Sequence, residues 1–338
     1  MTASFYLFDV DHGQCAALKL PDGKWCVFDA GCTANFSPIS WIANRHFQVT
    51  PRNALARALA IPQPIAGVNS LLGGMGQPRA NGLLGLAAAV PQPFSIYKAT
   101  ISHFHGDHID DYETLLRYNP SFMRTVNGID QEYIQDCYTT CSDRSRPKVA
   151  GFVNSYSGSF SGTHYADYGE ISIQELSLPT NIARSVGGSA NSRVNNASVV
   201  TRIDVYGNSI LICGDMEKEA WNAIIADTGE YGQQWRPMLT NIDILVAPHH
   251  GHASGYSTQL LNLARPSVVL TSVVTKDPNV DSRYSQAPVR GITINNAPYS
   301  SITTRTKGHI KIDIARPEGA LLIGKGKRTW TFGDAALR

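Results

Sequence analysis

The sequence lacks both a long apolar run and a secretory leader. No uninterrupted apolar stretch reaches the ~18 residues that a membrane-spanning helix requires. The first residues reach an acidic side chain at Asp9 and contain no basic group, unlike a signal peptide. With 43% apolar and 17% charged residues, the composition is that of a globular protein. We therefore expect a cytoplasmic protein with no membrane segment.

Strong charge, paired cysteines and a phosphate-binding loop are also missing. The formal net charge is only +2, and no dense run of Lys and Arg marks a nucleic-acid surface. The six cysteines form no C-x-x-C pair, so we expect them to be reduced and partly buried. The glycine run at residues 73–76 lacks the Gly-Lys-Ser/Thr ending of a nucleotide-binding loop. Other residues must therefore carry the chemistry.

Hydrophobic patterns predict short strands at both ends of the chain, with strands and helices alternating between them. The turn Pro21-Asp22-Gly23 joins two of the first strands and predicts an antiparallel opening. This order is typical of an α/β protein in which two sheets pack face to face with helices outside. We expect strands at residues 4–10, 16–20, 25–29, 97–102, 171–178, 198–205, 209–213, 242–247, 268–274, 309–314, 321–324 and 329–332, and helices at 52–60, 112–118, 217–226 and 258–263.

Two segments have irregular composition. Residues 33–95 are largely rich in Gly, Pro, Ala and Asn, and we predict an insertion there within a single domain of residues 1–338. We interpret its part at 62–93 as a lid or as a surface for a protein partner. Residues 141–166 are polar and rich in Ser and Gly, which predicts another loop.

The strongest signal is the distribution of histidine, because six of the ten histidines fall in two short clusters. The first cluster, Ser102-His103-Phe104-His105-Gly106-Asp107-His108, follows a predicted strand and precedes a predicted helix. Gly106 lets the backbone bend sharply between the side chains. A mixed set of imidazole and carboxylate groups suits Zn, Mn or Fe. The pattern therefore predicts a metal site at this turn.

Two further strands end in groups that can bind metal. The apolar strand at 209–213 is followed by Gly214-Asp215, whose carboxylate either caps the next helix or bridges two cations. The strand at 242–247 is followed by Pro248-His249-His250-Gly251, and this histidine pair is a candidate for a ligand or a general acid. His252 either supports the site or is simply exposed.

These motifs and their order resemble the metallo-β-lactamase superfamily, whose first metal motif is H-x-H-x-D-H. Within it the chain is most similar to the hydrolase domain of the DNA-uptake competence protein ComEC and its stand-alone relatives. One departure is Cys15-Ala16, where that group has Gly-Asp. The resemblance rests on Asp11-His12-Gly13-Gln14, Phe28-Asp29-Ala30-Gly31, Asn195-Asn196-Ala197-Ser198-Val199-Val200, Leu211-Ile212-Cys213-Gly214-Asp215 and Ala247-Pro248-His249-His250-Gly251.

The resemblance implies an αβ/βα four-layer sandwich with two mixed β-sheets flanked by helices. It also implies a site for two divalent metal ions, Zn or Mn, on one rim. Asn195 stands where many members have a third histidine for the first cation, and an amide oxygen is a poorer ligand. The implied ligands are His103, His105 and Asn195 for the first cation, Asp107, His108 and one of His249 and His250 for the second, and Asp215 for both.

Two cations about 3.5–4 Å apart can share a water and lower its pKa towards neutrality. The metal-bridged hydroxide would attack phosphorus while a histidine protonates the leaving oxygen. The candidate catalytic residues are Asp107, His249 and His250. We therefore predict a metal-dependent hydrolase, most simply a phosphodiesterase or nuclease, whose substrate is a nucleic acid or another phosphodiester.

Two other functions fit the same sequence. The near-neutral charge favours a hydrolase of a small ester, such as a choline phosphoester, a cyclic nucleotide or a lactone. A narrow pocket closed by the 62–93 segment would support it, whereas an open basic groove would support a nuclease. A non-catalytic, metal-stabilised binding subunit is the third possibility, and it requires at least one missing ligand.

Overall fold

The computed structural model describes residues 1–48, 94–143, 145–155, 166–167, 170–274, 277–286, 288–318 and 325–333. The predicted helix at 52–60, the segment at 62–93 and the predicted strand at 321–324 lie outside the described residues. The chain divides into two compact units, Met1–Ile39 with Ser95–Arg338, and Ser40–Phe94. Both large sheets and all candidate ligands belong to the first unit.

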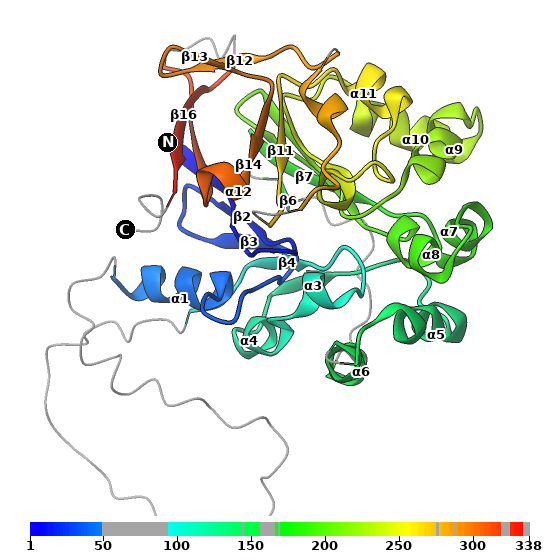
Figure 1. Cartoon of the computed structure of the whole chain (residues 1–338). Coiled ribbons are helices and arrows are strands. Elements are labelled where there is room, and N and C mark those ends of the chain that lie inside the picture. The colour runs from blue at the N-terminus through cyan, green and yellow to red at the C-terminus, as the bar shows by residue number, and fades with distance from the viewer. Residues whose placement is uncertain are drawn as a thin grey trace, which may run out of the picture. The chain divides into compact units, whose positions relative to one another are not determined.

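The first large sheet has the strand order β16-β15-β1-β2-β3-β4-β5, and Figure 1 labels β16, β2, β3 and β4 of it. The strands β1, β2 and β3 pair antiparallel, as the sequence predicts, whereas β3, β4 and β5 run parallel to one another. β15 pairs antiparallel with β1, so strands from both ends of the sequence meet in one sheet. The strands are β1 (Thr2–Leu7), β2 (Ala16–Lys19), β3 (Trp25–Phe28), β4 (Lys98–Thr100), β5 (Phe122–Arg124), β15 (Ile310–Ala315) and β16 (Lys327–Phe332).

The second large sheet has the order β14-β11-β10-β9-β8-β7-β6. Its strands β9, β10, β11 and β14 run parallel, and β8 and β9 form the predicted hairpin. The hairpin turn at Tyr206-Gly207 has φ values of 47° and 75°, as a tight turn between two twisted strands requires. The strands are β6 (Ala166–Asp167), β7 (Ile171–Leu176), β8 (Val200–Val205), β9 (Asn208–Ile212), β10 (Ile244–Val246), β11 (Val268–Thr271) and β14 (Ser301–Thr303), with a separate pair β12 (Ile292–Ile294) and β13 (Ala297–Tyr299).

Apolar side chains of both sheets form one buried core, in which Phe5 and Leu18 of the first sheet join Ile203 and Val246 of the second. Helices α9, α10 and α11 pack together beside the second sheet, and α3, α4 and α6 pack together near β4 (Figure 1). The predicted αβ/βα sandwich of two mixed sheets flanked by helices is therefore confirmed. The helices are α1 (Pro38–Gln48), α3 (Gly106–Ile109), α4 (Tyr112–Arg117), α5 (Gln131–Thr140), α6 (Arg146–Ser155), α7 (Thr180–Val186), α8 (Ala190–Asn196), α9 (Lys218–Ala226), α10 (Glu230–Leu239), α11 (Thr258–Ala264) and α12 (Thr304–Lys307), with short 3₁₀ turns η1 (Pro248–Gly251) and η2 (Ser282–Ser285).

Two expectations for irregular segments are wrong in part. Residues 146–155, predicted as loop, form α6, which buries Val149 and Phe152. Pro147 lies in the first turn of this helix, where its missing N–H costs nothing. In the segment 33–95, residues 38–48 form the helix α1. Composition is a weak guide here, because a short helix with few buried side chains depends on tertiary packing rather than on its own propensity.

A buried ion pair connects the two sheets. Lys98 on β4 and Glu175 on β7 have side chains that are only 3% and 1% exposed, and Nζ lies 2.7 Å from Oε2. Thr100 also donates its hydroxyl to the Glu175 carboxylate. Removing one partner would leave an uncompensated charge in the core, which costs much more than losing an exposed pair.

We predict that Glu175→Gln lowers the free energy of unfolding by about 3–5 kcal/mol, because the Lys98 ammonium then stays buried without its counterion. The double variant Lys98→Met/Glu175→Leu removes both charges and should regain most of this loss. Urea denaturation followed by circular dichroism measures both effects.

The exposed pair Lys24–Asp22, with an N–O distance of 2.8 Å, supplies the matched control. Asp22→Asn should change the free energy of unfolding by no more than about 1 kcal/mol. Equal losses for Glu175→Gln and Asp22→Asn would show that the buried pair does not hold the sheets together.

Candidate metal centre

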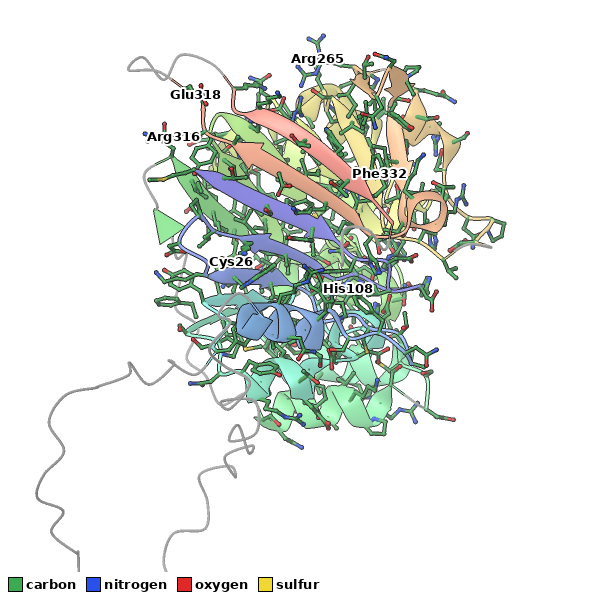
Figure 2. All side chains as sticks on the ribbon, turned by 90° about the vertical axis from the view of Figure 1, so that its left-hand side faces the viewer. Cys26, His108, Arg265, Arg316, Glu318 and Phe332 are labelled. Carbon is green, nitrogen blue, oxygen red and sulfur yellow. The ribbon has the colours of Figure 1, made fainter. Side chains whose placement is uncertain are left out.

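Parallel strands of both sheets end at one edge of the sandwich. β3 and β4 run parallel in the first sheet, and β9, β10 and β11 run parallel in the second. His108 lies at this edge of the strands (Figure 2). The residues that directly follow or closely follow these five strands are Asp29, His103, Asp215, His249 and Ser272. The topology therefore gathers side chains that lie far apart in the sequence.

The turns at this edge contain left-handed backbone. Asp29, His249 and His250 have φ values of 61°, 50° and 53°. For residues other than glycine this conformation costs about 1–2 kcal/mol each and is typical of functional sites. The turn η1 is held in place because the His249 N–H donates to the Gly214 carbonyl at 3.0 Å, which ties the end of β10 to the end of β9.

Asp215 does not cap the helix that follows it. The N-cap of α9 is Glu217, and the Asp215 N–H donates to Ser198 Oγ at 3.1 Å. The Asp215 carboxylate instead lies between the two histidine clusters, with one oxygen 3.3 Å from His108 Nε2 and the other 3.8 Å from His103 Nε2. The helix-cap alternative for Asp215 is therefore wrong.

The side chains converge in two groups that share Asp215. In the first, His103 Nε2 lies 3.1 Å from His105 Nδ1. In the second, His250 Nε2 lies 3.3 Å from His108 Nε2 and 3.1 Å from Asp107 Oδ2. Two ligand atoms on one tetrahedral cation with bonds of ~2.0–2.1 Å lie about 3.3 Å apart. The separations thus match those of atoms that share a cation.

The outer nitrogens of the second group are held by acceptors. His108 Nδ1 lies 2.9 Å from the carboxylate of Asp29, and His250 Nδ1 lies 3.2 Å from the backbone carbonyl of Ser272. A carboxylate or a carbonyl accepts a hydrogen bond, so each Nδ1 carries a proton, and in the neutral ring Nε2 is the nitrogen that can bind a cation. The two Nε2 atoms face each other at 3.3 Å, so a proton or a cation is needed between them.

The first group follows the same logic through hydroxyl groups. Ser102 donates its proton to Asp29 at 2.9 Å and therefore accepts from His103 Nδ1 at 3.0 Å. Thr140 donates to the Asp136 carbonyl at 2.9 Å and therefore accepts from His105 Nε2 at 3.2 Å. The remaining nitrogens of the two rings are lone pairs that point at each other. Four histidines thus direct a nitrogen into groups that could hold a metal ion.

Asn195 presents an unpartnered oxygen. Its Nδ2 donates to Glu217 Oε1 at 2.9 Å, which identifies the other terminal atom as Oδ1. Among the residues that the structure describes, this buried Oδ1 has no hydrogen-bond partner, and neither has Asp215 Oδ1. A buried acceptor without a partner costs about 1–3 kcal/mol. A cation would satisfy either acceptor.

The charges of the site depend on one another. Burial raises the pKa of Asp107 and Asp215, but the neighbouring histidines, His108 first, outweigh it and hold both pKa values below the ordinary range. Burial also lowers the pKa of His250, but Asp215 and Asp107 outweigh it and raise that pKa to about 10. Burial lowers the pKa of His108 too, but the same carboxylates, with Asp29, outweigh it and hold this pKa well above its usual value. Without metal, protons supply the positive charge that bound cations would replace.

The two adjacent histidines of η1 differ in environment. The His250 side chain is 1% exposed, whereas the His249 side chain is 18% exposed. His249 Nδ1 lies 2.8 Å from Ser254 Oγ, and its Nε2 lies 3.9 Å from Asp215. His252 is only partly exposed, and its Nε2 lies 2.8 Å from the Asp277 carboxylate. His250 therefore lies inside the second group, and His249 lies at its border.

Several supporting residues do not follow from the sequence motifs alone. Two of them can still be found from the sequence: Asp29 directly follows a predicted strand, and Ser102 directly precedes the first histidine of the first cluster. Thr140 and Glu217 leave none, because they come from helix ends that only the folded chain brings beside His105 and Asn195. Tertiary contacts of this kind orient ligands but have no local spacing rule.

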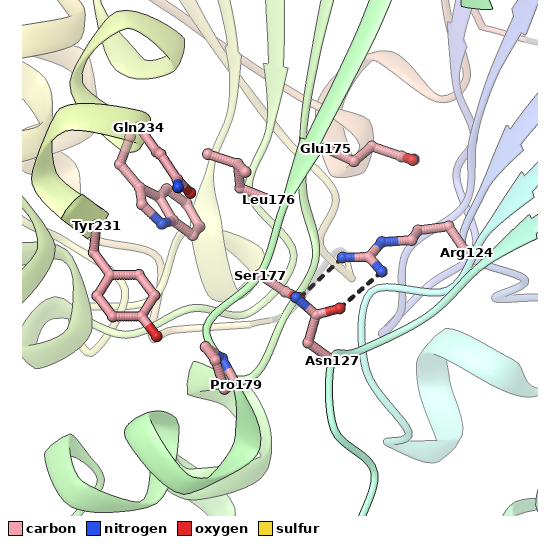
Figure 3. Close-up of a pocket in the computed structure, with 9 residues that line it drawn as sticks. Arg124, Asn127, Glu175, Leu176, Ser177, Pro179, Tyr231 and Gln234 are labelled. Atoms are coloured by element: carbon pink, nitrogen blue, oxygen red, sulfur yellow. Dashed lines mark hydrogen bonds between the residues drawn. The ribbon is translucent and has the colours of Figure 1, made fainter. Parts of the chain in front are cut away.

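A cavity lies apart from these groups. Within it Arg124 donates to Asn127 Oδ1 at 2.9 Å and to Ser177 Oγ at 3.4 Å (Figure 3). The lining residues are Arg124, Asn127, Glu175, Leu176, Ser177, Pro179, Tyr231, Gln234 and Trp235. No candidate ligand is among them, so this cavity is separate from the candidate metal centre.

No family model and no curated protein matches the chain. One similar solved structure is the metallo-β-lactamase-fold protein YhfI from Bacillus subtilis, with 11% identity, a TM-score of 0.37 and coverage of 81% of this chain and 87% of that one. A second is a new diphosphatase from the PhnP family, with 10% identity, a TM-score of 0.41 and coverage of 93% of this chain and 98% of that one. A third is the short form of human tRNase Z, with 11% identity, a TM-score of 0.33 and coverage of 81% of this chain and 93% of that one. These values are too low to place the chain in a family, and the similarity to the ComEC group stays a prediction. In the described part of the chain no helix is both long and apolar enough to cross a membrane.

We predict that Asp29→Asn weakens the binding of Zn about ten- to a hundredfold, because an amide cannot accept the His108 N–H and the Ser102 hydroxyl as the carboxylate does. Competition with a chromophoric chelator measures the affinity. Asp143→Asn is the control, since that side chain is 96% exposed and lies in a surface ion pair. Equal affinities of the Asp29 variant and the wild type would contradict the orienting role of Asp29.

Proposed function

We propose that this protein is a metal-dependent hydrolase with a site for two divalent cations. His103, His105 and Asn195 would hold the first cation, and Asp107, His108 and His250 the second. Asp215 would bridge them, because its Oδ1 lies 3.3 Å from His108 Nε2 and its Oδ2 lies 3.5 Å from His250 Nε2 and 3.8 Å from His103 Nε2. The observation that carries this proposal is that the inner nitrogens of four imidazoles converge beside two carboxylates, at the separations of ligand atoms on a shared cation. Mixed nitrogen and oxygen ligands without cysteine suit Zn or Mn.

The residues suggest a division of labour in hydrolysis. When bound, the two cations would lower the pKa of a water and neutralise charge on the substrate oxygens. Asp107 Oδ2 lies 3.1 Å from His250 Nε2, so this contact holds two candidate ligands of the second cation together. In this proposal His249 is not a metal ligand. Its Nδ1 is hydrogen-bonded to Ser254, and its Nε2 faces Asp215. His249 can act as a general acid that protonates the leaving oxygen.

A phosphodiester fits this arrangement better than an amide. Two cations suit the spread of negative charge over phosphoryl oxygens, and one histidine at the border suits protonation of an alkoxide leaving group. We propose a phosphodiesterase or nuclease, with a nucleic acid or another phosphodiester as substrate.

We expect the full chain loaded with Zn or Mn to cleave linear DNA and bis-p-nitrophenyl phosphate, and the variant Asp107→Ala/His108→Ala to cleave neither. The variant should also lose part of the bound metal, which elemental analysis measures. Turnover of the small diester alone would show that the substrate is a small ester. Two bound metals with no turnover of any phosphodiester would overturn the proposed activity.

The role of His249 has a separate test. We predict that His249→Gln lowers kcat on DNA about 10²–10⁴-fold, because the leaving alkoxide then lacks its proton donor. The loss on bis-p-nitrophenyl phosphate should be much smaller, since nitrophenolate leaves without a proton. The metal content should stay that of the wild type. Equal losses on both substrates, or loss of a metal, would show that His249 is a ligand instead.

A further inference from the structure

The loop between β1 and β2 is fastened to the metal centre at three points. The Gln14 N–H donates to the backbone carbonyl of Asp107 at 3.3 Å, and its side-chain amide donates to Asp29 at 2.9 Å. On the other side, Ser272 Oγ donates to the Gly13 carbonyl at 2.6 Å. The loop is thus bonded to a candidate ligand, to the carboxylate that orients His108 and to the end of β11.

The close approach requires a special backbone. A Cβ atom on Gly13 would come within 2.7 Å of the Asp107 carbonyl oxygen, so glycine is needed for this contact. Asp11, two residues earlier, has a φ of 57°, which is strained for a residue with a side chain. The strain and the three bonds together fix the residue between them, His12.

His12 lies over the second group of candidate ligands. Its ring centroid is 4.9 Å from that of His250, and its Nε2 is 3.9 Å from Asp107 Oδ2. One ligand atom from each of His12, Asp107 and His250 lies within 4.8 Å of the other two. The His12 side chain is 55% exposed, so this placement buries little of it and contributes little to folding.

We propose that His12 is a further ligand of the second cation, on the side that faces solvent. This inference rests on the proposed two-cation site. The neighbouring His252 is not a candidate ligand. Its Nε2 lies 2.8 Å from the Asp277 carboxylate, and it belongs to none of the candidate metal groups in the described chain. With His12, the second cation would have five protein ligands, against four for the first, and would be held more tightly.

Cobalt titration of the metal-free full-length protein tests this inference. We compare the wild type with His12→Gln and use His252→Gln as the matched control, since the ring centroids of the two histidines are 6.1 Å apart and both rings lie close to His250. We expect the wild type and the control to bind two cobalt ions with the same affinities. His12→Gln should bind the second-site ion about ten- to a hundredfold more weakly, as loss of a group that supports a metal does.

The visible spectrum gives a readout that is independent of activity. Loss of a fifth ligand should shift the second-site cobalt bands towards the stronger absorption of a four-coordinate ion. Unchanged affinity and spectrum in His12→Gln, or equal effects in His252→Gln, would overturn the role of His12 and leave the two-cation site standing. Absence of cobalt binding by the wild type would instead overturn the proposed site. Thermal unfolding confirms that the variants keep the fold.

Discussion

The buried carboxylate of Asp29 is the constraint on which the rest of the candidate metal centre depends. One of its oxygens accepts the Ser102 N–H at 2.6 Å, and the other accepts from Gln14, Ser102 and His108, each at 2.9 Å. A buried charge needs such a full set of donors to offset its desolvation. The donors come from the β1–β2 loop, the end of β4 and α3, so one side chain fixes three segments of the rim.

The orientation of the candidate ligands spreads outward from this group. Asp29 takes the proton of Ser102, which leaves the Ser102 oxygen free to accept from His103. It also fixes the tautomer of His108 directly. The same carboxylate thereby directs one lone pair into each of the two groups of ligands. Orienting partners of this kind matter for a metal site because the ligands themselves can rotate.

Stability and chemistry are placed in different parts of the molecule. The apolar core and the Lys98–Glu175 pair hold the two sheets together. Three left-handed residues, Asp29, His249 and His250, lie at one rim together with the unpartnered oxygens of Asn195 and Asp215. Such strained and unsatisfied groups persist only where a rigid scaffold supports them. The parallel ends of β3, β4, β9 and β10 supply this scaffold.

Much of the fold can be predicted from the sequence, because the strands are either continuous apolar runs, such as β10 and β11, or alternate between apolar and polar residues, such as β7 and β15. The hairpin around Tyr206-Gly207 and the antiparallel opening follow from local patterns and turn residues. The helices α5, α6, α8 and α10 do not, since each is short and polar on most of its surface. Helices of this kind gain their stability from neighbours that the local sequence does not name.

The sequence by itself determined which chemistry is available. The spacing of His103, His105, Asp107 and His108 within one turn, and the residues that end β9 and β10, are local features that predict metal ligands. Only the tertiary structure decided that His250 rather than His249 lies inside the second group, that Asp29 orients the rings and that His12 reaches the site. The physical reason is that the hydrogen-bond partner of one ring nitrogen decides whether the other nitrogen keeps its lone pair for a metal ion. Those partners are brought together by the sheets and not by their order along the chain.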